Sequence, residues 1–176
     1  MGGVWIREAH MDDAPAIAGI HLDAWQVAYA GLLPAPYLQG LTAQHVARTD
    51  YWREQLAVAQ GLWVAQVGAE VVGWAAAGPS RDDDAHLLVG EIQGLYLHPR
   101  YWRFGIGTPL LRTALARLLR QGFTEATLWV LQGNTRAQGF YRARGFKEQP
   151  RVSKVLQVGG AQVSERRYWR SLKTPL

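Results

Sequence analysis

The chain has 176 residues, 48% of them hydrophobic, which suits one compact domain over residues 1–176 with a sizeable core. No stretch approaches the roughly 18 consecutive apolar residues of a membrane span, and the polar first ten residues do not resemble a secretory signal. The absence of cysteine excludes disulfides and thiolate chemistry. We therefore expect a cytoplasmic protein with no membrane partner.

Charge is divided unevenly along the chain. Residues 1–97 contain 4 Lys and Arg against 11 Asp and Glu, a balance of −7, whereas residues 98–176 contain 15 against 3, a balance of +12. Such asymmetry suggests a partner with a separate polyanionic part. Nucleic acid is one such partner, and a solvated basic surface with no dedicated partner is the alternative.

The first half of the chain predicts one strand, two helices and a hairpin. Apolar spacing and turn residues place them, in order, as a strand at 4–9, a helix to about residue 30, a helix ending before residue 61, and hairpin strands at 62–67 and 71–78. Asp12 or Asp13 is expected to cap the first helix and Thr42 the second. The segment 31–36, which contains two prolines, is expected to separate them.

The second half predicts a β-α-β unit followed by another helix and a terminal hairpin. The elements expected are a polar loop at 78–84, a strand at 90–99, a helix with one apolar stripe from 106 to 121, a strand at 126–133, a helix at 134–144, and strands near 152–158 and 163–172. Three antiparallel strands followed by a β-α-β crossover imply a mixed sheet with helices on its faces.

A glycine-containing junction links the strand at 90–99 to the next helix. The segment HPRYWRFGIGTPLL, from His98 to Leu111, holds Gly105 and Gly107 at the point where the helix opens. Several backbone N–H groups can converge there on one anion, helped by the helix dipole. The segment has no Walker pattern, and Leu110 occupies the third glycine position of the dinucleotide fingerprint. From these residues alone, a phosphate cradle and a turn shaped only for geometry both remain open.

This junction and the segment GNTRAQGFYRARGF at 133–146 together closely resemble the GNAT superfamily of acyl-CoA-dependent N-acetyltransferases. The family's pyrophosphate loop, (Arg or Gln)-x-x-Gly-x-(Gly or Ala), falls on residues 102–107, here called the junction loop. Its later signature falls on Asn134, Tyr141, Gly145 and Phe146. The resemblance covers nearly the whole chain. It implies a single-domain α/β (α+β mixed) fold: a mostly antiparallel twisted sheet of about seven strands with one splayed parallel pair, flanked by about four helices.

The resemblance implies acetyl-CoA as co-substrate, with no metal. The residues expected to bind it are Leu95, Tyr96, Leu97, Arg103, Phe104, Gly105, Ile106, Gly107, Thr108, Asn134 and Tyr141. Arg103, Arg136 or Arg142 would supply positive charge to its phosphates. The splayed strands would be residues 94–97 and 128–131, with a bulge at Gly94.

The junction loop departs from the family at two positions. Trp102 stands where Arg or Gln is usual, and Arg103 stands where many relatives place an additional glycine. The loop keeps its donors if Arg103 adopts the backbone angles that glycine adopts easily. We expect Arg103 to point outward and return charge to the phosphates, while Trp102 packs over the loop.

The resemblance also implies direct attack of an amine on the thioester. Glu91 would deprotonate the amine directly or through water, the Leu95 amide would stabilise the tetrahedral intermediate, and Tyr141 would protonate the departing thiolate. The residues themselves leave two alternatives open. Glu91 can instead pair with an arginine, and Tyr141 can be a core aromatic.

The acceptor is the least defined part of the prediction. Trp25 and Tyr29 are candidate substrate-binding residues because aromatic rings attract a cation, although their i, i+4 spacing also fits core packing. The acidic run Asp82–Asp84 either attracts a cationic acceptor or forms a solvated loop. We expect an amine-bearing acceptor, no nucleic acid, and a possible homodimer. The alternative function is a non-catalytic acyl-CoA-binding or sensing module on the same fold.

Overall fold

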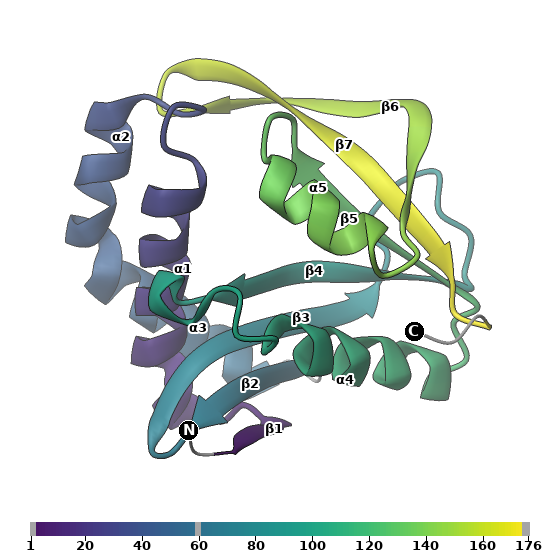
Figure 1. Ribbon diagram of the computed structural model, residues 1–176, viewed down its shortest axis with the longest axis horizontal. Helices are drawn as coiled ribbons and strands as arrows, with labels where there is room; N and C mark the ends of the chain where they lie inside the picture. Colours follow the sequence, from purple (N-terminus) through teal and green to yellow (C-terminus); the bar gives the residue numbers. More distant parts are fainter. Residues whose placement is uncertain (1–2, 59–60, 174–176) are drawn as a thin grey trace.

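A computed structural model of the chain describes residues 3–58 and 61–173. Its centre is a seven-stranded sheet with the order β1-β2-β3-β4-β5-β7-β6 (Figure 1). The strands are β1 (Val4–Glu8), β2 (Leu62–Val67), β3 (Glu70–Pro79), β4 (Val89–Leu97), β5 (Glu125–Leu131), β6 (Lys147–Val158) and β7 (Ala161–Ser171). Strands β4 and β5 are parallel and the other neighbouring pairs are antiparallel, which confirms the predicted mixed sheet.

Four longer helices flank the sheet, as the sequence predicts. They are α1 (Ala14–Ala28), α3 (His45–Val58), α4 (Gly107–Arg120) and α5 (Thr135–Arg142). The segment that the prolines predict as a break instead contains a short helix, α2 (Ala35–Gly40). Pro36 is tolerated in the first turn of α2, where its missing N–H has no intrahelical partner. The predicted end of the second helix, at residues 59–60, lies outside the described part of the chain.

The start of α1 differs in detail from the predicted cap. Asp13 occupies the N-cap position, but its carboxylate makes no cap hydrogen bond to the helix. It instead accepts from both terminal nitrogens of Arg7, at 2.7 and 2.8 Å, and from the His10 main-chain N–H at 2.9 Å. The Arg7 hydrogen bond and the other partners outweigh burial and hold the pKa of Asp13 below its usual value. The ion pair therefore fixes β1 against the beginning of α1.

Strand β6 begins earlier than the sequence predicts. It starts at Lys147, five residues before the expected position, and its pairing with β7 is interrupted between Glu148 and Ser153. Pro150 lacks an N–H for the ladder, and Arg151 has a left-handed φ of 65°. This irregular stretch disrupts the alternation by which a strand is recognised in sequence.

The two faces of the sheet bury separate apolar clusters, and β2 shows how. Trp63 and Ala65 belong to the cluster under α4, whereas Leu62 and Val64 belong to the cluster that contains residues of α1 and α3. Successive side chains of a strand point to opposite faces. Strand β2 is therefore covered on both faces, which explains its nearly continuous apolar sequence.

Strands β4 and β5 separate in the middle of the sheet. Their pairing ends at Glu91 and Thr127, although both strands continue for several residues. Opposite β3, Ile92 pairs with Ala77 and Gly94 with Ala76, so Gln93 is an extra residue on β4. The bulge thus lies at Gln93–Gly94, as the sequence predicts. Beyond it, the edge of β4 that faces β5 carries main-chain groups that β5 does not bind.

Candidate active site

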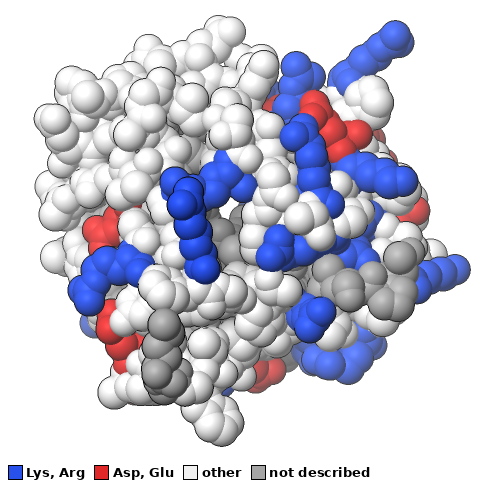
Figure 2. Space-filling model, viewed as in Figure 1, with Lys and Arg blue, Asp and Glu red and all other residues white. Residues whose placement is uncertain are grey.

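A cavity of about 1110 Å³ lies where β4 and β5 separate. We call its two ends the α4 side, near the junction loop and α5, and the α1 side, near α1 and the β6–β7 hairpin. Figure 2 shows a hollow near the centre of this face with Lys and Arg around it, whereas the region over α2 is free of charged side chains. The predicted site residues that line the cavity are Trp25, Tyr29, Glu91, Leu95, Tyr96, Leu97, Arg103, Gly105, Ile106, Gly107, Thr108, Asn134 and Tyr141.

Phe104 is the predicted binding residue that does not line the cavity. Its side chain is 54% exposed, on the outside of the junction loop. The main-chain N–H of Phe104 is therefore the part of this residue that remains a candidate donor. The sequence had assigned it on the loop pattern, which specifies backbone positions rather than side-chain directions.

The junction loop has the backbone that its sequence requires. Arg103 has φ 69° and Gly105 has φ 78°, both in the left-handed region. A non-glycine residue there costs roughly 1–2 kcal/mol, which is why a glycine at position 103 is the less strained choice. The loop of this chain adopts the conformation in spite of the arginine.

Trp102 packs against the end of β4, under a cationic side chain. Its indole Nε1 donates to the Leu97 carbonyl oxygen at 2.8 Å, and the Arg136 guanidinium lies 4.0 Å from the ring centroid. This is a cation–π geometry. Trp102 therefore holds Arg136 beside the junction loop, and both residues line the cavity.

A third arginine lies at the opening of α4. Arg144 donates from Nε and Nη2 to the Thr108 hydroxyl oxygen, at 3.1 and 2.6 Å, and its guanidinium lies 3.8 Å from the Phe140 ring centroid. Sequence reasoning missed it and named Arg142. Arg142 does not line the cavity; it donates to Glu148 and to Tyr168. Helical spacing could have identified Arg144. In the predicted helix at 134–144 it lies three positions after Tyr141 and shares its face, whereas Arg142 is the next residue and does not.

Asn134 and Tyr141 face the cavity from the two ends of α5. Asn134 is the N-cap, and its side-chain oxygen accepts from the Ala137 N–H at 3.2 Å. Tyr141 is 8% exposed, and burial, assisted by Tyr96, raises the pKa of its phenol. The phenol therefore stays protonated at neutral pH, and it can donate a proton or a hydrogen bond to a group in the cavity.

Glu91 lies on β4 at the last residue paired with β5 and is 2% exposed. Its carboxylate accepts from the Arg81 main-chain N–H at 3.0 Å, from Nε at 3.2 Å and from Nη2 at 2.5 Å. The arginine pairing that the sequence left open is thus present. The Arg81 side chain itself is 63% exposed and belongs to a loop, so it can move without disturbing the sheet.

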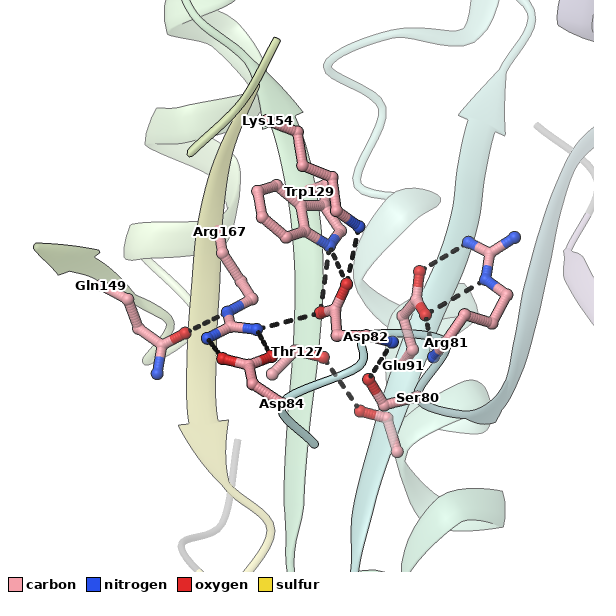
Figure 3. A network of polar contacts seen from close by, with 11 residues as sticks. Ser80, Arg81, Asp82, Asp84, Glu91, Thr127, Trp129, Gln149, Lys154 and Arg167 are labelled. Atoms are coloured by element: carbon pink, nitrogen blue, oxygen red, sulfur yellow. Dashed lines mark hydrogen bonds and ion pairs between the residues drawn. The ribbon is translucent and has the colours of Figure 1, made fainter. Parts of the chain in front are cut away.

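The acidic residues that follow β3 bind the loop that carries Arg81 to β5, β6 and β7 (Figure 3). Asp82 accepts from Trp129 Nε1 at 3.1 Å, from Lys154 Nζ at 2.6 Å and from Arg167 Nη1 at 3.2 Å. Asp84 accepts from Nη1 and Nη2 of the same Arg167 guanidinium, at 2.5 and 2.7 Å. The Asp82 side chain is 3% exposed. Asp82 is therefore a buried ion-pair partner, whereas Asp83 and Asp84 are exposed, the Asp84 side chain to 64%, and none of the three lines the cavity. The interpretation as a solvated loop is thus wrong for Asp82, and the interpretation as an attractor of the acceptor has no support from the cavity lining.

Trp25 and Tyr29 line the α1 side, with ring centroids 5.0 Å apart. Both also pack against the apolar cluster formed by α1, α2 and the hairpin. Burial raises the pKa of Tyr29 well above its ordinary value, so its hydroxyl is neutral. These two rings serve as core residues and as a wall of the cavity at once.

Sequence reasoning missed the residues that β5, β6 and β7 contribute to the cavity. They include Trp129, Lys154 and Glu165. No motif marks them. Strand alternation could have indicated the direction of Glu165, because positions 163, 165 and 167 share one face of β7. The loop at 82–84 covers part of this face, through the contact of Asp84 with Arg167.

Two further structural facts concern other classes of function. Within residues 3–58 and 61–173, no group of three or more His, Asp or Glu side chains is arranged to hold a metal ion. No helix in this part of the chain is long and apolar enough to cross a membrane.

Comparison with known proteins identifies the family. The model of the acetyltransferase (GNAT) family matches residues 25–146. The uncharacterised N-acetyltransferase YuaI of Bacillus subtilis (strain 168) is 33% identical over 132 residues, which cover 74% of this chain and 73% of YuaI.

Solved structures agree on the fold. The PaiA N-acetyltransferase of Thermoplasma acidophilum, in complex with coenzyme A, has a TM-score of 0.71 and 20% identity, covering 93% of this chain and 98% of that one. YncA of Salmonella typhimurium, a putative acetyltransferase with acetyl-CoA, has a TM-score of 0.71 and 19% identity, covering 96% and 94%. The family match, the relative and the fold agree with the sequence-based prediction of an acetyl-CoA-dependent N-acetyltransferase, and this chain belongs to the GNAT family of acetyltransferases.

Proposed function

We propose that the protein transfers the acetyl group of acetyl-CoA to a primary amine by direct attack. The observation that carries this proposal is the separation of β4 from β5 inside one cavity that reaches the N-terminus of α4. A main-chain edge, a set of helix N–H groups and three arginines are thereby aligned along one path. This order suits a ligand that has an amide chain at one end and phosphates at the other.

The α4 side is the proposed place of the coenzyme's phosphates. The main-chain N–H groups of residues 103–107 are the proposed donors beside the opening of α4, where the dipole favours an anion, while the Thr108 N–H donates to the Gly105 carbonyl oxygen at 3.3 Å. Arg103, Arg136 and Arg144, which all line the cavity, are proposed to add positive charge there. The binding of coenzyme A by PaiA and of acetyl-CoA by YncA, which share the fold, supports this placement.

The pantetheine chain is proposed to pair with the free edge of β4 at Leu95, Tyr96 and Leu97, as an added strand would. Asn134 lies across the cavity from this edge and offers its amide N–H₂. The bulge at Gln93–Gly94 changes the direction of the next N–H, so that the Leu95 amide is the proposed donor to the thioester oxygen.

In the proposed reaction, the ammonium of the acceptor first loses a proton to Glu91, directly or through one water. The amine nitrogen then forms the C–N bond, and the carbonyl oxygen carries negative charge while the Leu95 amide stabilises it. The C–S bond breaks, and Tyr141 donates its proton to the sulfur. The nitrogen, which carries a positive charge after the attack, gives its second proton to solvent as the amide forms. The proton taken by Glu91 also leaves to solvent, and solvent returns one proton to Tyr141.

The alternative is a module that binds acetyl-CoA without catalysis, and the pairing of Glu91 with Arg81 is the observation that favours it. Two measurements on the same sample separate them. Acetyl-CoA is expected to raise the melting temperature, and a panel of primary amines is expected to release free thiol in its presence. Stabilisation without thiol release would favour the binding module. The absence of both stabilisation and thiol release would reject both functions.

A further inference from the structure

The α1 side of the cavity contains a carboxylate that the proposed mechanism does not use. Glu165 lies on β7, opposite Leu131 of β5 and opposite Lys154 of β6. Its side chain is partly buried and lines the cavity. It therefore lines the same cavity as Glu91, but it comes from β7, on the far side of β5 from β4.

The cations near Glu165 have other partners. Lys154, which faces it in register, instead directs Nζ to Asp82 at 2.6 Å and lies 4.0 Å from the Trp129 ring centroid (Figure 3). Arg81 binds Glu91. Within the described part of the chain, the Glu165 carboxylate has no hydrogen bond or ion pair.

This isolation has an electrostatic consequence. Burial raises the pKa of Glu165, and the negative charge of Glu91 raises it further, while Lys154 and Arg81 oppose the shift from a distance. A partly buried carboxylate without a partner favours any cation that can reach it. The α1 side thus offers an incoming ammonium a carboxylate that makes no direct hydrogen bond or ion pair with the described residues.

The walls around Glu165 are apolar and aromatic. Apolar and aromatic side chains at this end of the cavity include Trp25, Tyr29, Leu33, Leu156, Val158 and Val163, and the paired cations Arg81 and Lys154 also line the cavity. Such walls suit the hydrocarbon part of a ligand, and the two rings suit the ammonium.

The tip of the β6–β7 hairpin packs against α2 beside this end of the cavity. Val158 and Val163 pack with Tyr37 of α2 in one apolar cluster, and a side chain at Gly159 would collide with the Tyr37 ring. Figure 1 shows the hairpin reaching across to the α2 region. This contact joins the hairpin to α2 beside the α1 side of the cavity.

From these features we propose that Glu165 binds the ammonium of the acceptor, and that the acceptor is a small primary amine with an apolar body and no carboxylate beside the amine. The proposal rests on the proposed function. A carboxylate on the neighbouring carbon, as in an α-amino acid, would lie close to Glu165, and the cations that could balance it are already paired.

The first arm of the test uses the native protein and matched acceptors. Initial rates are measured with acetyl-CoA and 2-phenylethylamine against phenylalanine, and 3-methylbutylamine against leucine. We expect kcat/KM to be at least about tenfold higher for each amine than for its amino acid, since one charged contact is lost or reversed. Equal values for both members of the pairs would overturn the assignment of the substrate class.

The second arm uses Glu165→Gln, with Glu54→Gln as the matched control. Glu54 is an exposed glutamate on α3. In Glu165→Gln, KM for the better amine is expected to rise about tenfold or more, with kcat changed less than about threefold and KM for acetyl-CoA unchanged. The ratio of kcat/KM for the amine to kcat/KM for its amino acid should decrease. Glu165→Asp, which keeps the charge, should recover part of the affinity even if the glutamine variant folds poorly.

The outcomes distinguish a failure of the Glu165 proposal from a failure of the proposed acetyl transfer. Transfer that is as insensitive to Glu165→Gln as to Glu54→Gln would overturn the role of Glu165 while leaving acetyl transfer intact. No thiol release with any primary amine, in protein that acetyl-CoA still stabilises, would instead reject the proposed function and this inference with it.

Discussion

The Glu91 carboxylate is held by Arg81 from both the main chain and the side chain. The main-chain N–H lies 3.0 Å from Oε2, and the guanidinium donates to Oε2 at 3.2 Å and to Oε1 at 2.5 Å. The glutamate is on a rigid central strand, whereas the arginine is on a loop. This pairing makes Glu91 either a base that Arg81 positions or a purely structural ion, and substitution distinguishes the two.

Glu91→Gln is expected to lower kcat by a factor of about 10²–10⁴, the usual contribution of a general base, with little effect on acetyl-CoA affinity. Arg81→Gln is the matched control, because it breaks the same ion pair but keeps the carboxylate. It should lose much less activity. Equal losses in steady-state kinetics for the two variants would show that the ion pair, not the base, is what matters.

Tyr141→Phe removes a hydroxyl whose pKa burial has raised. We expect kcat to fall by about 10²-fold or more while the dissociation constant of acetyl-CoA stays the same, because the proton is needed only when the thiolate departs. Tyr168→Phe is the control, since Tyr168 is a buried tyrosine whose hydroxyl binds Glu148 and Arg142 outside the cavity. Unchanged turnover in Tyr141→Phe would remove this residue from the acid role.

Arg103→Gly should change stability and binding in opposite directions. The left-handed φ of 69° is strained for arginine, so glycine is expected to raise the free energy of unfolding by about 1 kcal/mol. Affinity for acetyl-CoA should fall, and its dependence on salt should weaken, because one phosphate contact is lost. Urea unfolding and titrations at two salt concentrations test this. Unchanged affinity and salt dependence would contradict the idea that Arg103 compensates for the missing glycine.

His21 predicts a pH dependence of stability. Burial, together with the charge of Arg48, lowers its pKa to about 4, whereas the unfolded chain has the ordinary value near 6.5. The stability linked to this residue is therefore complete above pH 6.5 and is lost as pH falls from there toward 4. Between pH 7 and pH 5 the loss should reach about 2 kcal/mol.

His21→Phe keeps a ring among the neighbouring aromatic side chains and removes the titration. Its free energy of unfolding, measured with urea at both pH values, should fall by correspondingly less than that of the native protein. The same fall in both proteins would mean that another group is responsible.

Most of the fold could be predicted from patterns of residues that are close together in the sequence. The junction loop and the Asn134–Tyr141 helix were recognisable because their glycines, cap and spacing lie within a few residues of one another. The left-handed backbone at Arg103 was anticipated for the same reason. The predicted start of β6 lies too far along the chain, because Pro150 and Arg151 interrupt the alternation of the strand.

The rest of the site depends on contacts between distant residues. Arg81 meets Glu91 across a hairpin loop, Asp82 meets Lys154 and Arg167 on strands far along the chain, and Glu165 enters the cavity only because β7 lies between β5 and β6. A single sequence contains the charges but not their pairing. Consequently the residues that line the α4 side of the cavity were largely predictable, whereas the pairing of the charges near the α1 side was not.

The most direct test of the account is to follow the acetyl group itself. The protein is incubated with acetyl-CoA labelled in the acetyl group and an excess of 2-phenylethylamine, and free thiol and labelled amide are quantified in the same samples. We predict equal amounts of thiol and N-acetylated amine, with both rates falling together in Tyr141→Phe. Thiol released without amide, or no thiol from any primary amine while acetyl-CoA still binds, would contradict acetyl transfer to an amine.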